Sequence, residues 1–166
     1  MNLKDFFLIA INASIKGGQA IMEVYSSHFE VEHKEDDTPL TLADKNCNTV
    51  IENILQQTGV PILSEEGTDI PYLERRDWEY FWLVDPLDGT KEFVKRNGEF
   101  TVNIAMIYNG KPIIGVIYVP VKKELYFAME GLGSFKIVAN SLVENLNELV
   151  NDAEKLPIDY KKNNYT

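Results

Sequence analysis

Cysteine and long apolar runs are both scarce in this sequence. Cys47 is the single cysteine among the 166 residues, so an intramolecular disulfide is excluded and a reducing compartment is favoured. No apolar run approaches the roughly 20 residues that a bilayer-spanning helix needs, and the apolar stretch at residues 6–10 is too short for a secretory signal core. We therefore expect a cytoplasmic protein, and the sequence leaves peripheral membrane association open.

Basic residues are also few, because 16 Lys and Arg stand against 26 Asp and Glu and give a net charge of −10. This excess argues against nucleic acid as a partner and against an anionic membrane bound through a basic surface. A small-molecule phosphate substrate remains compatible with it, since bound cations can reverse the local sign of the field. The only two histidines, His28 and His33, lack metal-ligand spacing and are expected at the surface.

Two helices are expected in the first third of the chain, whose 45% hydrophobic content suffices for one core. Residues 3–25 have apolar side chains at helical spacing, and the Gly-Gly pair at 17–18 either weakens this helix or lets a neighbour approach closely. The second helix is expected to begin with Thr41 as its N-cap and to end at Gly59. Cys47 falls on its apolar face and is predicted to be a core residue.

Strands dominate the rest of the pattern. Residues 80–84 form a continuous apolar run, which predicts a strand buried on both faces, and Asn109-Gly110 predicts a hairpin turn. Residues 67–79 read as a surface loop. Further strands are expected at residues 29–33, 60–63, 101–108, 112–119, 125–129 and 134–138, and an amphipathic helix at 139–155. The order of elements indicates an α+β fold with helices packed on one face of a mainly antiparallel sheet.

Acidic residues directly follow the predicted strand at 80–84. Asp85 and Asp88 suit the first and last positions of a turn that Pro86 helps to form, so both carboxylates can point to one side. Such a pair would repel unless cations neutralise it, and hard oxygen ligands suit Mg²⁺ or Mn²⁺. Gly89 permits close approach of a backbone, and Thr90 can open a helix whose free amides face a phosphate. The same residues are also typical of an ordinary surface turn.

Two other acidic positions fit the same pattern. Glu65 follows Ser64 at the end of the short apolar run 60–63, although acids there are also typical of a solvated loop. Asp44 lies near the start of the second helix, where an acid can simply face the helix dipole.

Together these segments resemble the three N-terminal motifs of the inositol monophosphatase superfamily, in order and in spacing. The motif segments are residues 39–44, 64–66 and 85–90. Within residues 88–105, the Lys-Glu-Phe that follows Gly-Thr and the Asn-Gly-Glu-Phe before the next strand look like CysQ-type 3'(2'),5'-bisphosphate nucleotidases. Residues 115–120 and 130–133 continue a likeness that covers about residues 10–138.

The resemblance implies a role for each matching position. Glu65, Asp85, Asp88 and the Leu87 carbonyl resemble the metal ligands, for two or three Mg²⁺ ions in the complete enzyme, with Mn²⁺ as a substitute. Asp44 and Thr90 resemble the catalytic pair that orients and deprotonates the attacking water. The substrate phosphate is expected to contact Glu65, Leu87, Asp88, Gly89 and Thr90. Ser64 stands where inositol-type members usually carry Gly.

The implied activity is Mg²⁺-dependent hydrolysis of the 3'-phosphate of adenosine 3',5'-bisphosphate to AMP and phosphate. An inositol-phosphate or sugar-phosphate phosphatase would use the same residues, so this alternative stays open. A non-catalytic module that binds metal or phosphate is the alternative of another class.

The resemblance also implies a second domain that supplies a Trp-Asp motif, whose Asp completes the metal site, and a Gly-Gly segment. Neither Asp152 nor Asp159 has that motif around it. We expect residues 1–138 to form an N-terminal metal-binding phosphatase domain and residues 139–166 a helix and linker toward a missing C-terminal domain. The chain by itself is then expected to be inactive or weakly active, and self-association through an uncovered apolar face is possible.

Overall fold

The computed structural model describes residues 2–27 and 39–157. The strand expected at 29–33 and both histidines lie outside the described residues. Among the described helices, none is both long enough and apolar enough to cross a bilayer.

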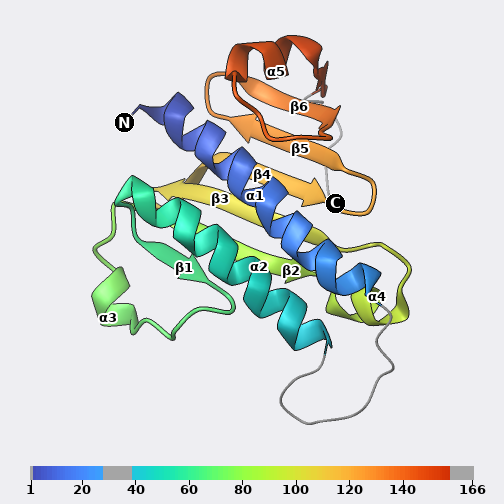
Figure 1. Cartoon of the computed structure of the whole chain (residues 1–166). Coiled ribbons are helices and arrows are strands. Elements are labelled where there is room, and N and C mark those ends of the chain that lie inside the picture. Colours follow the sequence, from blue (N-terminus) through green and yellow to red (C-terminus); the bar gives the residue numbers. More distant parts are fainter. Residues whose placement is uncertain (1, 28–38, 158–166) are drawn as a thin grey trace, which may run out of the picture.

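Helices pack on a single seven-stranded sheet with the strand order β1-β2-β3-β4-β5-β6-β7 (Figure 1). The strands are β1 (Ile62–Ser64), β2 (Tyr80–Asp88), β3 (Thr101–Tyr108), β4 (Lys111–Val119), β5 (Glu124–Met129), β6 (Gly133–Val138) and β7 (Glu154–Lys155). The helices are α1 (Leu3–Ser26), α2 (Pro39–Leu55), α3 (Tyr72–Arg75), α4 (Thr90–Lys95) and α5 (Leu146–Asp152), with a 3₁₀ turn, η1, at Gln56–Thr58. Neighbouring strands are antiparallel except β1 and β2, which are parallel. The α+β prediction is confirmed.

Helix α1 runs unbroken through its two central glycines. A Cβ on Gly17 would lie 2.9 Å from the Cys47 Sγ, and a Cβ on Gly18 would lie 2.6 Å from the Tyr118 ring. The glycines therefore let α2 and β4 approach α1 closely, which is the second of the two alternatives that the sequence left open. At its start, the Asn2 side chain accepts a hydrogen bond from the Asp5 amide at 3.0 Å.

Helix α2 begins earlier than the sequence predicted. It starts at Pro39, so Thr41 lies inside the first turn and its assignment as N-cap is wrong. The helix ends at Leu55, and η1 continues to Gly59, which adopts φ 69° as the predicted stop.

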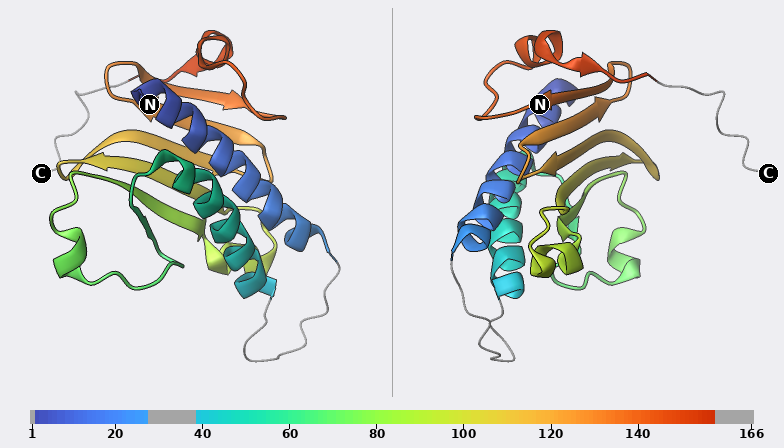
Figure 2. Two further views of the ribbon diagram at one scale, coloured as in Figure 1. Left: turned by 60° about the vertical axis from the view of Figure 1, so that its left-hand side comes forward. Right: turned by 90° about the vertical axis from the view of Figure 1, so that its right-hand side faces the viewer.

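The sheet buries one face only, so the prediction that β2 is buried on both faces is wrong. Trp82 and Val84 are buried beneath the helices, whereas Leu83 between them is 44% exposed on the other face. Figure 2 shows α1 and α2 together on one side of the sheet. On β4, Ile117 is 45% exposed, so apolar side chains also occupy the face away from these helices.

The hairpin and the loop before β2 agree well with expectation. Asn109 and Gly110 adopt φ 46° and 75°, as a two-residue turn between β3 and β4 requires. The predicted surface loop at 67–79 contains only the short helix α3.

The long helix predicted at residues 139–155 is wrong in extent. Asn145 caps α5 by accepting hydrogen bonds from the next turn, so the helix cannot begin before Leu146. Upstream, Asn12 of α1 exchanges two 2.8 Å hydrogen bonds with the backbone of Val143, which holds this segment against α1 in a non-helical form. After α5 the chain becomes extended and β7 pairs with β6.

Candidate active site

The candidate site lies where the pairing between the parallel strands β1 and β2 ends. Ser64, the last residue of β1, is paired with Val84 of β2, so the next residues, Glu65 and Asp85, lie side by side. The Glu65 amide donates to the Val84 carbonyl at 3.0 Å and fixes this arrangement. Two acidic residues 20 positions apart in the sequence are thereby brought to one edge.

Asp85 and Asp88 belong to an irregular part of β2 instead of the free turn that the sequence predicted. Asp85 is paired with Asn103 of β3 and Asp88 with Thr101, so the register shifts between them as in a β-bulge. The Leu87 amide donates to the Asp85 carboxylate. The bulge, instead of a turn, keeps both acids on the end of the strand.

Asp44 joins this group from α2. Its side chain is buried, with 9% exposure. Burial is the largest cause that raises the pKa of Asp44 to about 7, and the negative charges of Glu66, Asp85 and Glu65 contribute to the same increase, in that order. Because Glu66 is the charged neighbour that raises the pKa of Asp44 most, it belongs to the same cluster, although no role for it was predicted from the sequence.

Asp85 is affected in the same way. Burial, followed by the negative charges of Glu65 and Asp88, raises the pKa of Asp85 to about 6. The predicted residues Asp44, Glu65, Asp85 and Asp88 are thus close enough to repel one another.

Two oxygen atoms of the cluster are buried without a partner. Oδ1 of Asp44 and Oδ1 of Asp85 accept no hydrogen bond. Across residues 2–27 and 39–157, no three His, Cys, Asp or Glu side chains form a compact cage of metal ligands. Mg²⁺ does not need such a cage, because it commonly binds through one or two carboxylates, waters and a substrate phosphate. The unpartnered, mutually repelling carboxylates fit that ion.

The predicted phosphate segment follows directly. Gly89 adopts φ 93°, and a Cβ there would lie 2.8 Å from the Glu99 carbonyl, so only glycine fits. Thr90 is the exposed first residue of α4, as the sequence predicted. The buried Phe93 anchors α4 against the rings of Tyr25 and Phe100. Within the described residues, no hydrogen bond joins Thr90 to Asp44.

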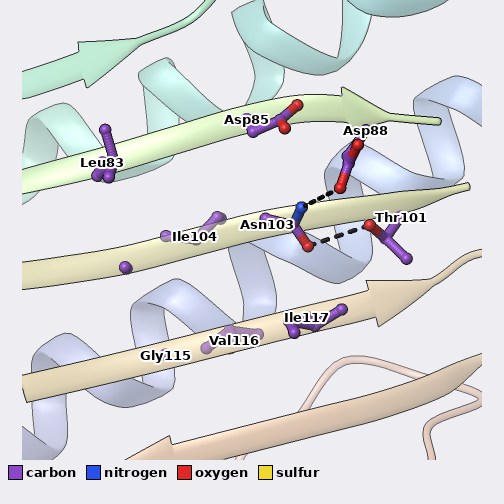
Figure 3. Close-up of a pocket in the computed structure, with 10 residues that line it drawn as sticks. Leu83, Asp85, Asp88, Thr101, Asn103, Ile104, Gly115, Val116 and Ile117 are labelled. Atoms are coloured by element: carbon purple, nitrogen blue, oxygen red, sulfur yellow. Dashed lines mark hydrogen bonds between the residues drawn. The ribbon is translucent and has the colours of Figure 1, made fainter. Parts of the chain in front are cut away.

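Polar neighbours of the acids were not predicted from the sequence. The Ser64 hydroxyl donates to Asn48 Oδ1 at 2.6 Å, one helical turn after Asp44 on α2. Because residues four positions apart share one face of a helix, the spacing of Asp44 and Asn48 could have identified Asn48 as a neighbour of the acids from the sequence. Figure 3 shows Asn103 hydrogen-bonded to Asp88, which depends on the register of β2 and β3 and had no local signal.

Two of the acids, Asp85 and Asp88, open onto the uncovered face of the sheet. Asp85 and Asp88 line one end of a shallow hollow of about 480 Å³, and Leu83 and Ile117 line its apolar part (Figure 3). In this view the helices lie behind the sheet, so the hollow is on the face opposite to them.

The chain is similar in sequence to several curated proteins named 3'(2'),5'-bisphosphate nucleotidase CysQ. That of Salmonella typhimurium is 56% identical over 119 residues, which make up 69% of this chain and 48% of the relative. That of Haemophilus influenzae is 38% identical over 136 residues, or 81% of this chain and 49% of the relative. The chain therefore spans about half the length of the curated relatives it matches.

Solved structures agree with these matches. A crystal structure of CysQ from Bacteroides thetaiotaomicron superposes with a TM-score of 0.88 at 45% identity, covering 95% of this chain and 59% of that one. An inositol monophosphatase from Anabaena has a TM-score of 0.63 at 30% identity, covering 81% and 46%. The sequence model described as the inositol monophosphatase family matches residues 2–155. This chain therefore belongs to the inositol monophosphatase family.

Proposed function

We propose that the protein is a Mg²⁺-dependent phosphatase that removes the 3'-phosphate of adenosine 3',5'-bisphosphate, giving AMP and phosphate. The observation that carries this proposal is the convergence of Asp44, Glu65, Asp85 and Asp88 with two buried oxygens unpartnered. The substrate follows from the name of relatives such as the Salmonella typhimurium 3'(2'),5'-bisphosphate nucleotidase CysQ, which is 56% identical to this chain over 119 residues.

Each acid has a distinct proposed task. Glu65, Asp85 and Asp88, together with the Leu87 carbonyl, hold Mg²⁺. When bound, Mg²⁺ supplies positive charge that offsets the repulsion among the carboxylates, activates water and stabilises charge on the phosphoryl oxygens. The bulge of β2 supports this assignment because it places Asp85 and Asp88 at the same strand end.

Two further residues act on the attacking water. Asp44 accepts its proton, and the Thr90 hydroxyl helps to orient it toward the phosphorus. The phosphate is proposed to lie along Gly89 and Thr90, at the start of α4, where the first backbone amides of a helix have no carbonyl partner one turn earlier. These contacts, with Glu65, Leu87 and Asp88, form the proposed substrate-binding set.

Part of the site is proposed to lie outside these residues. Because the chain spans about half the length of its relatives, the activity is proposed for the complete gene product. A C-terminal domain that follows residues 139–166 would supply the remaining metal ligand and a wall for the nucleoside. The cytoplasm is the proposed location.

Inositol phosphates are the competing substrates, since the Anabaena inositol monophosphatase is 30% identical to this chain. The test is to assay the complete gene product with Mg²⁺ on adenosine 3',5'-bisphosphate and on inositol 1-phosphate, with Asp85→Asn as the control. We expect the nucleotide to have the higher kcat/KM and Asp85→Asn to abolish turnover. A preference for inositol 1-phosphate would overturn the substrate, and turnover that persists in Asp85→Asn would overturn the site.

A further inference from the structure

Two hydrogen bonds link the side chains of three residues on neighbouring strands. Thr101 Oγ1 donates to Asn103 Oδ1 at 3.1 Å, and Asn103 Nδ2 donates to Asp88 Oδ2 at 3.2 Å (Figure 3). Thr101 and Asn103 are two positions apart on β3, so both side chains lie on the same face. The three groups form a continuous chain that ends on a proposed metal ligand.

The bulge in β2 explains why Asn103 reaches Asp88. Asn103 is paired across the strands with Asp85, while Thr101 is paired with Asp88. Two residues of β2 separate the two acids, whereas a single residue of β3 separates their partners. Asn103 is thus the cross-strand neighbour of Asp85, and the register shift also brings Asp88 within hydrogen-bonding distance of its side chain.

The order of donors fixes which way the carboxamide of Asn103 points. The Thr101 hydroxyl donates to the oxygen of the amide, so the nitrogen is left facing Asp88. A carboxamide suits this position because it donates to a carboxylate without adding charge to an acidic cluster. Thr101 therefore acts on Asp88 only through Asn103.

Asp88 needs such a partner more than the other acids of the cluster. Asp44 is buried and Asp85 partly buried, and Asp85 also receives the Leu87 amide. Asp88 is exposed, and its carboxylate is free to rotate unless a neighbour holds it. The side chain that does hold it is Asn103, which donates a hydrogen bond to Asp88 Oδ2.

We propose that Asn103 is a positioning residue that holds the Asp88 carboxylate in its metal-binding orientation and that Thr101 orients Asn103. This inference rests on the proposed function, because it assumes that Asp88 binds Mg²⁺. Removing an outer-shell partner of a metal ligand typically lowers metal affinity or activity by about 10–100-fold. Since Asp88 and this hydrogen bond are exposed, the expected effect is at the lower end, about tenfold.

The test uses the complete gene product with Asn103→Ala, Thr101→Val, the double variant, and Ala105→Ser as the control on the same strand and face. The Mg²⁺ concentration for half-maximal turnover and the melting temperature without divalent cations are measured for each. Thr101→Val is nearly isosteric and removes only the donor. It therefore gives an independent reading even where Asn103→Ala reduces folding.

We expect Asn103→Ala to raise the half-maximal Mg²⁺ concentration about tenfold while the metal-free melting temperature stays unchanged. Thr101→Val should have a smaller effect, and the double variant should equal Asn103→Ala, because Thr101 acts through Asn103. A wild-type-like Mg²⁺ requirement in Asn103→Ala would overturn the proposal. Additive effects of the two substitutions in the double variant would overturn the part that assigns Thr101 to orienting Asn103. A wild-type protein without Mg²⁺-dependent turnover would instead overturn the proposed function on which the inference rests.

Discussion

The thiol of Cys47 donates a hydrogen bond to the carbonyl oxygen of Pro86, with Sγ and oxygen 3.2 Å apart. This bond joins the middle of α2 to the bulge of β2 between Asp85 and Asp88. Burial, with the negative charges of Asp44 and Asp85, raises the pKa of the thiol and keeps it a donor at neutral pH. Cys47 thus helps to hold the helix that carries Asp44 against the strand that carries the other acids.

Replacing that thiol tests the link. Cys47→Ala should destabilise the fold by about 1–3 kcal/mol, because it leaves a small cavity and an unpaired buried carbonyl. For a chain of this size, this corresponds to a loss of several degrees in melting temperature. Cys47→Ser keeps a donor and is the matched variant. An unchanged melting temperature in Cys47→Ala would show that the bond contributes nothing to stability.

Local signals in the sequence predicted much of the candidate site. The acids at the ends of β1 and β2 and the glycine before α4 follow directly from short motifs, and the structure brings the acids together. The contribution of Asn103 could not be predicted, because it depends on which residue of β3 faces the bulge. The burial of β2 was misjudged because an apolar run does not reveal that Leu83 faces away from the helices.

The repulsion among the acids predicts a pH dependence in the absence of divalent cations. In the folded state the pKa of Asp44 is raised from 3.8 to about 7 and that of Asp85 from 3.8 to about 6. At pH values between 3.8 and these raised pKa values, the folded state therefore binds more protons than the unfolded state. Stability should therefore fall as pH rises from about 4 to 7. Asp85→Asn should make this fall smaller, whereas the remote, exposed Asp152→Asn should not. Melting temperatures measured across this range in EDTA check the sign, and a rise with pH would contradict it.

Divalent cations should reverse this loss of stability. Any ion that binds only the folded state raises stability by about 2.7 kcal/mol at 100 times its Kd. We expect Mg²⁺ or Mn²⁺ to raise the melting temperature of the 166-residue chain, and Glu65→Gln to reduce the increase. Glu130→Gln, an exposed position in the β5–β6 turn, is the control. A melting temperature that stays flat to high millimolar Mg²⁺ would contradict a cation site in these residues.

Alanine substitutions at two glycines with similar backbone angles can distinguish a steric clash from backbone strain. Gly89 and Gly110 adopt φ 93° and 75°, but a Cβ on Gly89 would lie 2.8 Å from the Glu99 carbonyl, whereas a Cβ on Gly110 meets nothing within 4 Å. Gly89→Ala should therefore destabilise the fold more than Gly110→Ala, whose penalty is limited to about 1 kcal/mol of backbone strain. Equilibrium unfolding in urea measures both. Equal losses would show that the approach of Glu99 to Gly89 is not tight.

The last prediction is that the 166-residue chain has little phosphatase activity by itself. Asp85 and Asp88 border a hollow on the uncovered face of the sheet, so the described part of the site is open to water. Water weakens the electrostatic stabilisation of a transition state, and the apolar lining at Leu83 and Ile117 forms only one side of a binding site. The test compares this chain with the complete gene product and with the chain carrying Asp85→Asn, on adenosine 3',5'-bisphosphate with Mg²⁺. A tenfold difference in rate corresponds to roughly 1.4 kcal/mol in barrier height. The prediction would be contradicted if the 166-residue chain turned over within about tenfold of the complete gene product and Asp85→Asn abolished that turnover. These residues would then already contain the whole active site.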